Sequence, residues 1–171
     1  MTLKYSNLAL FDEQTLEDTR QNWTAFAGGH SVFMLECGPI FDWIEERLGE
    51  DGAMETVAYG LFEPGATTAA AIVEVVNSAK TRGPMIKMLK VLVSPQFWDT
   101  VTHRQEVLNI FIGAIAGCVN LSVKKKTKIL KLYGRTNELL SVMMDIHTRL
   151  VSSPINGISA KIEGRWLVLE G

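Results

Sequence analysis

The chain has 171 residues, 47% of them hydrophobic and 21% charged, and its formal net charge is −2. This length and composition predict one globular domain over residues 1–171 and exclude a disordered chain. The small net charge excludes a strong overall attraction to nucleic acid or to an anionic membrane.

The cysteines and the most apolar stretch indicate the cellular setting. Cys37 and Cys118 lie far apart without metal-ligand or redox spacing, so we expect two buried free thiols. Residues 107–123 are at the short limit for a membrane span and are interrupted by polar side chains, so a buried helix explains them better. The N-terminus has no secretory signal pattern. We therefore expect a cytoplasmic protein, or part of an assembly built in the cytoplasm.

The first third of the chain predicts one strand followed by two helices. Asp12 or Thr15 is the expected cap of the first helix. The elements in order are a strand at residues 8–11, a helix to about residue 26, an apolar run at residues 31–36 without an assigned element, and a helix at residues 39–48 that Pro39 opens.

The middle of the chain predicts an antiparallel meander of three strands. The strands cover residues 53–62, 69–79 and 85–93, and short turns at residues 63–66 and 81–84 join them. The third strand is apolar on both faces apart from Lys87 and Lys90, which is typical of a central strand covered on both sides.

A loop at residues 94–100 then leads into the longest predicted helix, residues 102–123. Small residues form a patch on this helix that lets another backbone approach closely: Gly113, Ala114, Ala116 and Gly117. Lys124–Lys126 end the helix, where cations complement the carbonyl end of the helix dipole.

The last part of the chain predicts a strand, a helix and a hairpin. The strand covers residues 129–133, and Thr136 or Asn137 caps a helix that runs to about residue 150. The hairpin covers residues 158–169, turns at Glu163–Gly164, and is expected to place five residues on one face: Ile158, Ala160, Ile162, Trp166 and Val168.

The order of these elements resembles the acyl-CoA N-acyltransferase (GNAT) superfamily over nearly the whole chain. The resemblance implies an α+β fold with a central, mostly antiparallel mixed sheet flanked by helices on both faces. In that family the strand matching residues 85–93 ends in a glycine-rich loop, whose amides bind the cofactor pyrophosphate at the start of the next helix. Leu132–Asn137 resembles the family's fifth strand and the turn that follows it.

The matching loop in this chain, Val93–Gln105, contains no glycine. Bulky and β-branched side chains at residues 97–104 block close approach of a phosphate to the backbone. Asp99 repels a pyrophosphate, and Arg104 only partly offsets it. We therefore expect no cofactor, no metal and no catalytic residue. The alternative is an acetyl-CoA-dependent N-acetyltransferase with a divergent cofactor site.

A second resemblance is carried by Val93–Trp98, the long helix and the turn at Asn137. In these features the chain is similar to small internal virion proteins of short-tailed phages. This resemblance implies an acetyltransferase-like fold without a cofactor loop, used as a subunit of a phage particle.

Several side chains have functional chemistry but also an ordinary structural explanation. Glu55 and Glu74 lie in the predicted meander, where a strand carboxylate of the resembled family deprotonates an amine; Glu74 is the better candidate because its neighbours are valines. Tyr133 is a candidate general acid or a packing residue. The histidines share no spacing with a carboxylate that suggests a triad or a metal site: His30, His103 and His147.

Two features favour binding to other protein subunits. Phe97 and Trp98 are adjacent large aromatics in a loop, and either the chain itself or a partner must cover them. The Lys124–Lys131 stretch holds five lysines, which are explained by a solvated helix end or by docking on an acidic partner surface or nucleic acid. Nucleic acid is not favoured, because no aromatic residue is interleaved before Tyr133.

The sequence therefore leads to two main hypotheses. The first is a non-catalytic structural or interaction protein with an acetyltransferase-like fold that forms an oligomer or a larger assembly. The second is an N-acyltransferase with a divergent cofactor site. An immunity or inhibitor protein is also compatible with the chain's size and acidity.

Overall fold

The computed structural model describes residues 3–51, 54–80, 83–155 and 157–171. A seven-stranded sheet forms its centre, with the strand order β1-β2-β3-β4-β5-β7-β6. All neighbouring strands are antiparallel except β4 and β5, which are parallel. The strands are β1 (Asn7–Ala9), β2 (Thr56–Phe62), β3 (Ala71–Lys80), β4 (Gly83–Val93), β5 (Ile129–Tyr133), β6 (Ser159–Glu163) and β7 (Trp166–Glu170).

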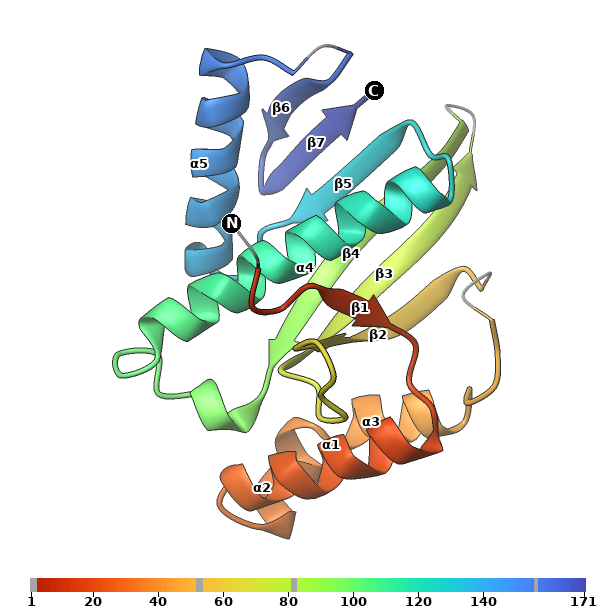
Figure 1. Ribbon diagram of the computed structural model, residues 1–171, viewed down its shortest axis with the longest axis vertical. Helices are drawn as coiled ribbons and strands as arrows, with labels where there is room; N and C mark the ends of the chain where they lie inside the picture. The colour runs from red at the N-terminus through yellow and green to blue at the C-terminus, as the bar shows by residue number, and fades with distance from the viewer. Residues whose placement is uncertain (1–2, 52–53, 81–82, 156) are drawn as a thin grey trace.

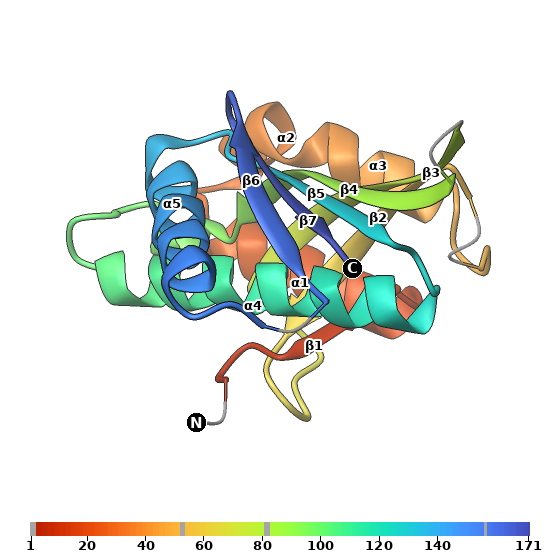
Figure 2. The same cartoon turned by 90° about the horizontal axis from the view of Figure 1, so that it is seen from above.

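Helices cover both faces of this sheet (Figure 1). One face carries α4 and α5, and the other carries α1, α2 and α3; Figure 2 shows α4 and α3 on opposite sides of the strands. The helices are α1 (Glu13–Phe26), α2 (His30–Glu36), α3 (Gly38–Glu45), α4 (Arg104–Lys124) and α5 (Asn137–Ser152), with a short 3-10 helix, η1 (Pro95–Phe97). The predicted α+β fold is confirmed, and the predicted order of elements is confirmed apart from α2, which is an additional helix.

The local signals explain where α1 and α5 begin. The Asp12 carboxylate accepts the Thr15 amide at 2.7 Å, and the Thr15 hydroxyl accepts the Asp12 amide at 3.0 Å, which forms a capping box. Thr136 caps α5 by accepting the Leu139 amide at 3.2 Å. The cap of α5 is therefore Thr136, whereas Asn137 is the first helical residue.

The meander is confirmed, with β2, β3 and β4 paired in sequence. The turn after β2 is closed by the Ala66 amide, which donates to the Glu63 carbonyl. Part of the predicted second turn, at Thr81 and Arg82, and Ala53 at the predicted start of the first meander strand lie outside the described residues. Strand β4 is central, as expected, because β3 and β5 flank it and helices pack on both faces.

One helix was not predicted and one prediction is wrong. Residues 31–36, for which no element was predicted, belong to α2, a short helix that buries only Phe33 and therefore lacks the amphipathic pattern of a longer helix. The predicted hairpin face is wrong, because Trp166 pairs with Glu163 and Ile162 pairs with Leu167. Cross-strand partners share a face, so Leu167 joins Ile162 on the α5 side, while Trp166 and Val168 lie on the other side.

The backbone that closely approaches the small-residue patch of α4 is the N-terminal segment of this same chain. A Cβ at Gly113 would collide with the Tyr5 carbonyl oxygen, and one at Gly117 would lie 2.8 Å from the Leu8 Cβ. The N-terminal segment therefore crosses α4 directly over these glycines. Helix α4 is long and apolar enough to cross a membrane, but half of its most apolar window is buried inside the structure.

Both cysteines are free and buried, as predicted. Burial raises the pKa of the Cys37 thiol to about 11 and that of Cys118 to about 12. Both thiols therefore stay protonated at neutral pH and act as small apolar side chains.

Candidate functional site

The candidate site is the junction of β4 and α4, where the resembled family binds its cofactor. Strands β4 and β5 pair only from Met85 to Met88 of β4, after which β4 continues to Val93 paired with β3 alone. A pocket of about 380 Å³ lies between the first turns of α4 and α5. Its lining residues are Thr100, Val101, Arg104, Val107, Leu108, Glu138 and Ser141.

The loop between β4 and α4 is anchored at its start. The buried Ser94 donates its amide to the Ala70 carbonyl at 2.9 Å, and its hydroxyl caps η1 by accepting the Gln96 amide at 3.4 Å. Phe97 is only 8% exposed and packs edge-to-face on His103 at 5.6 Å. These contacts hold the loop against the sheet without any outside ligand.

Asp99 occupies the centre of this loop. Its carboxylate accepts the Val101 amide at 3.2 Å, the Thr102 amide at 3.3 Å and the Thr102 hydroxyl at 2.6 Å. The Thr102 hydroxyl and the two amides hold the pKa of Asp99 below its usual value. Asp99 is exposed to solvent and therefore acts as an anion of the chain's own that accepts the loop amides.

Most of the loop amides donate to acceptors within the chain. The Phe97 amide donates to the Ser94 carbonyl, the Trp98 amide to the Pro95 carbonyl, and the His103 amide to the Asp99 carbonyl. Together with the bonds to Ser94 and Asp99 side chains, this satisfies the amides of Gln96, Phe97, Trp98, Val101, Thr102 and His103. An incoming pyrophosphate would have to displace these acceptors.

Trp98 and Arg104 line the outside of the junction. The Trp98 ring is 39% exposed, and its Nε1 donates to the Val93 carbonyl at 3.2 Å. Arg104 is exposed, and among the described residues no ion pair joins it to Asp99. Of the two aromatics expected at a partner surface, only Trp98 is available. Phe97 is covered by the chain's own fold, which is one of the two alternatives that the sequence left open, so Phe97 is not available for docking.

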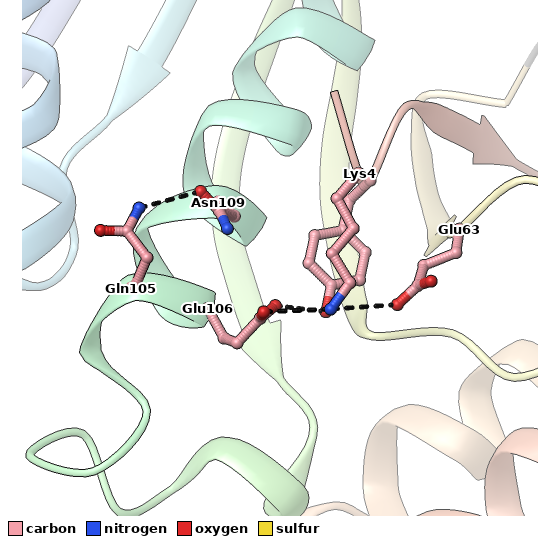
Figure 3. Close-up of polar contacts among 6 residues, drawn as sticks. Lys4, Glu63, Gln105, Glu106 and Asn109 are labelled. Carbon is pink, nitrogen blue, oxygen red and sulfur yellow. Dashed lines mark hydrogen bonds and ion pairs between the residues drawn. The ribbon is translucent and has the colours of Figure 1, made fainter. Parts of the chain in front are cut away.

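A polar cluster fixes the N-terminal segment beside this loop (Figure 3). The Tyr5 hydroxyl donates to Glu106 at 2.8 Å, and Lys4 Nζ lies 3.0 Å from Glu106 and 3.5 Å from Glu63. The cluster borders an open pocket of about 540 Å³ that Ser94, Phe97 and His103 also line. The sequence gives no signal for this cluster, because Tyr5 and Glu106 lie about a hundred residues apart.

The ionisation of this cluster does not suit acid–base catalysis near neutral pH. Burial and the bond to Glu106 raise the pKa of Tyr5 to about 12. Partial burial opposes ionisation of Glu106, but Tyr5 and Lys4 outweigh it and hold the pKa of Glu106 below its usual value. A general acid or base works best with a pKa near the operating pH, so this cluster is better suited to holding the N-terminal segment.

The other sequence candidates do not come together. Glu74 forms an ion pair with Lys90 at 3.8 Å on the α3 side of the sheet, because its neighbours Val73 and Val75 point to the α4 side. Glu55 is exposed just before β2, and Tyr133 packs on Trp166 at 4.8 Å. The histidines lie on separate elements: His30 on α2, His103 before α4 and His147 on α5.

Among residues 3–51, 54–80, 83–155 and 157–171, no group of three or more His, Cys, Asp or Glu side chains is placed to hold a metal ion.

The Asn137 side chain accepts a hydrogen bond from Arg165 at 3.4 Å. Asn137 therefore links the start of α5 to the hairpin turn.

Several solved structures are similar to this chain in fold. A probable acetyltransferase from Staphylococcus epidermidis is 13% identical, with 95% of this chain and 96% of that chain covered and a TM-score of 0.48. A GNAT-family protein from Desulfovibrio desulfuricans is 12% identical, with 95% and 93% covered and a TM-score of 0.47. The structure of AtaTR bound with AcCoA is 10% identical, with 95% and 92% covered and a TM-score of 0.46.

No protein-family model and no curated protein sequence matches the chain. The order of the strands and helices agrees with the GNAT-like fold that the sequence resembles. At 10–13% identity the likeness to solved structures concerns the fold alone. The chemistry must be argued from the residues of this chain.

Proposed function

We propose that this protein is a non-catalytic interaction protein that uses a GNAT-like fold to bind other protein subunits. The observation that carries the proposal is the Asp99 carboxylate, which accepts the Val101 and Thr102 amides in the loop between β4 and α4. Those amides belong to the loop that binds the cofactor pyrophosphate in the resembled family. Here the chain supplies its own anion, so a second anion meets charge repulsion and no free amides at Val101 and Thr102.

The side chains around Asp99 support the same proposal. The loop has no glycine, and residues 97–102 are bulky or β-branched apart from Asp99, so the backbone cannot approach a phosphate closely. Trp98 and Val101 are exposed instead, at 39% and 90%. Exposed aromatic and aliphatic side chains in a rigid loop suit contact with a partner protein.

The proposed binding surfaces are the exposed part of this loop, centred on Trp98, and the Lys124–Lys131 stretch. In that stretch Lys124, Lys126 and Lys128 are exposed. A subunit of a phage particle is the most specific form of this role. Mass spectrometry of purified phage particles tests that form. Absence of the chain from the particles would contradict a virion subunit.

Isothermal titration with acetyl-CoA tests the non-catalytic proposal. We expect no heat of binding and no thermal shift with the wild-type chain. A micromolar dissociation constant would overturn the proposal. The companion variant Asp99→Ala removes the chain's own anion, and any acyl-CoA binding that it gains over the wild type would assign the block to that carboxylate.

The second candidate function is an N-acyltransferase with a divergent cofactor site. The pocket between the first turns of α4 and α5 favours it, because Arg104 lines the pocket and is exposed to an incoming phosphate. Under this function acetyl-CoA binds, and Arg104→Ala weakens binding by about tenfold or more, as loss of a charge-assisted contact predicts. Arg149→Ala, an exposed cation on α5, is the matched control and should leave binding unchanged.

A further inference from the structure

The charges of this chain are divided between its two parts. Residues 1–70, which form β1, α1, α2, α3 and β2, contain 12 acidic and 3 basic side chains. Residues 71–171 contain 7 acidic and 14 basic side chains. The net charge of −2 therefore hides a strongly acidic part and a strongly basic part of one molecule.

The basic part exposes cations at the C-terminal end of α4. Lys124, Lys126 and Lys128 are exposed, and among the described residues none of the three forms an ion pair. Their neighbours are engaged: Lys125 donates to Asn77 at 3.1 Å, and Lys131 lies 3.7 Å from Glu163. We call Lys124, Lys126 and Lys128 the basic end of α4.

An open groove of about 740 Å³ adjoins this basic end. It runs between β1 and the C-terminal half of α4, and its lining includes Leu10, Asn120 and Lys124. Val119 and Val123 lie one turn apart on the same half of α4, and Val123 is 73% exposed. Leu8, Leu10 and Leu121 line the groove itself, so it offers apolar contacts beside the exposed charge of Lys124.

The acidic part exposes a complementary surface on the other side of the sheet (Figure 2). Asp42, Glu45 and the C-cap Glu46 lie on one exposed face of α3. Glu45 pairs with Arg20 at 2.7 Å and Glu46 with Arg47 at 3.4 Å, and the side chains of both glutamates stay more than half exposed. The adjoining α2 exposes Val32, Met34 and Leu35, and Leu35 is 78% exposed. We call Asp42, Glu45 and Glu46 the acidic face of α3.

We propose that the basic end of α4 and its groove bind the acidic face of α3, with the apolar residues of α2, in a second copy of this chain. Opposite charges on the two surfaces attract and orient the copies, and the exposed aliphatic residues are removed from water at the contact. The two surfaces lie on opposite sides of the sheet, so the contact joins different patches of the two copies and can extend into a ring or a filament.

The mixed chemistry of the groove favours a protein over a nucleic acid. Asp51 and Leu10 line it together with Lys124, whereas a groove that tracks a phosphate backbone presents uniform positive charge. The acidic side chains that such a groove needs are abundant on the same molecule. A second copy of this chain is one partner for the proposed interaction role, so this contact rests on that role.

Charge-reversal variants of the full chain test the contact by sedimentation velocity over a range of protein concentrations and salt. We expect the wild type to self-associate, and more weakly at high salt. Lys124→Glu with Lys128→Glu, and separately Asp42→Lys with Glu46→Lys, should each weaken self-association by at least about tenfold. An equimolar mixture of the two variants should associate again, because opposite charges face each other once more.

The control is Arg149→Glu, which reverses an exposed cation in the last turn of α5 and should leave association unchanged. Circular dichroism confirms that each variant is folded. A wild type that stays monomeric overturns the proposal, and so do folded variants whose mixture fails to associate. A monomeric wild type that binds a fluorescent DNA duplex through Lys124 and Lys128 would assign the basic end to nucleic acid instead. Acetyl-CoA binding is measured separately, so each proposal fails by its own result.

Discussion

The two ends of α4 differ in how their polar groups are satisfied. At the N-terminal end, Asp99 and the neighbouring carbonyls take up the loop amides, and Phe97 is covered. At the C-terminal end, Lys124, Lys126 and Lys128 are exposed and have no ion pair within the described chain. The difference teaches that the chain's own acceptors take up most of the loop amides at one end of this helix, whereas cations remain exposed at the other end.

The middle of α4 packs tightly on the N-terminal segment, and disrupting this packing has the largest expected effect on stability. Gly113→Val places methyl groups against the Tyr5 carbonyl and should destabilise the protein by about 2–3 kcal/mol through overpacking. Urea denaturation measures the loss. Ala116→Val, at a half-buried position of the same helix, should cost less than about 1 kcal/mol. Equal losses for the two variants would contradict the close approach at Gly113.

Tyr5→Phe sharpens the picture of the N-terminal end. It removes the hydroxyl that donates to Glu106 and should cost about 1–2 kcal/mol, because the acceptor is charged and Tyr5 is buried. Glu63→Gln, which removes only an exposed ion pair, should cost less than about 1 kcal/mol. Urea denaturation of the three proteins gives these differences.

The pKa of Tyr5, raised to about 12 from the ordinary 10.0, fixes the pH dependence of this contribution. A group with a raised folded-state pKa stabilises the fold below its unfolded pKa and loses that contribution as the pH rises through the folded value. The advantage of the wild type over Tyr5→Phe should therefore be constant between neutral pH and pH 10.0 and vanish as the pH approaches about 12. An advantage that persists beyond that range would contradict a protonated Tyr5 hydroxyl at Glu106.

Lys126→Gly probes the C-terminal end and is expected to stabilise the protein. Lys126 has a φ of 53°, a left-handed conformation that glycine adopts without steric cost. The expected gain is about 0.5–1 kcal/mol, read from thermal unfolding. Lys124→Gly, inside the last turn of α4, should have the opposite sign. A loss at Lys126 would show that its side chain makes a contact worth more than the backbone strain.

Asp99→Asn has the smallest expected effect on stability and bears directly on the loop between β4 and α4. The pKa of Asp99 is lowered by Thr102 and the loop amides, so its charge stabilises the fold above the ordinary carboxyl range and this contribution is lost as the pH falls through the folded value. Wild type and variant should therefore differ in Tm at neutral pH and converge in acid. A constant difference at all pH values would mean that the charge of Asp99 does not matter to the loop.

Much of the site was visible in the sequence as a pattern of residue types. The absence of glycine from Val93–Gln105 indicated that the family's loop chemistry is missing, and Asp99 was recognised as repulsive to a phosphate. Its bonds to the Val101 and Thr102 amides were not predictable, because they depend on the backbone path of the turn. The burial of Phe97 and the exposure of Trp98 were not predictable for the same reason, since both depend on what packs over the loop.

The sequence by itself determined the α+β class, the order of the elements and most of their boundaries, because capping residues, turn residues and the period of apolar residues are local signals. Only the tertiary structure decided that Tyr5 reaches Glu106, that the N-terminal segment covers Gly113, and that Trp166 faces away from Ile162. These contacts join residues far apart in the chain or depend on strand register, and no local pattern encodes them. The tertiary structure likewise set the two ends of α4 apart, by covering one and leaving the other exposed.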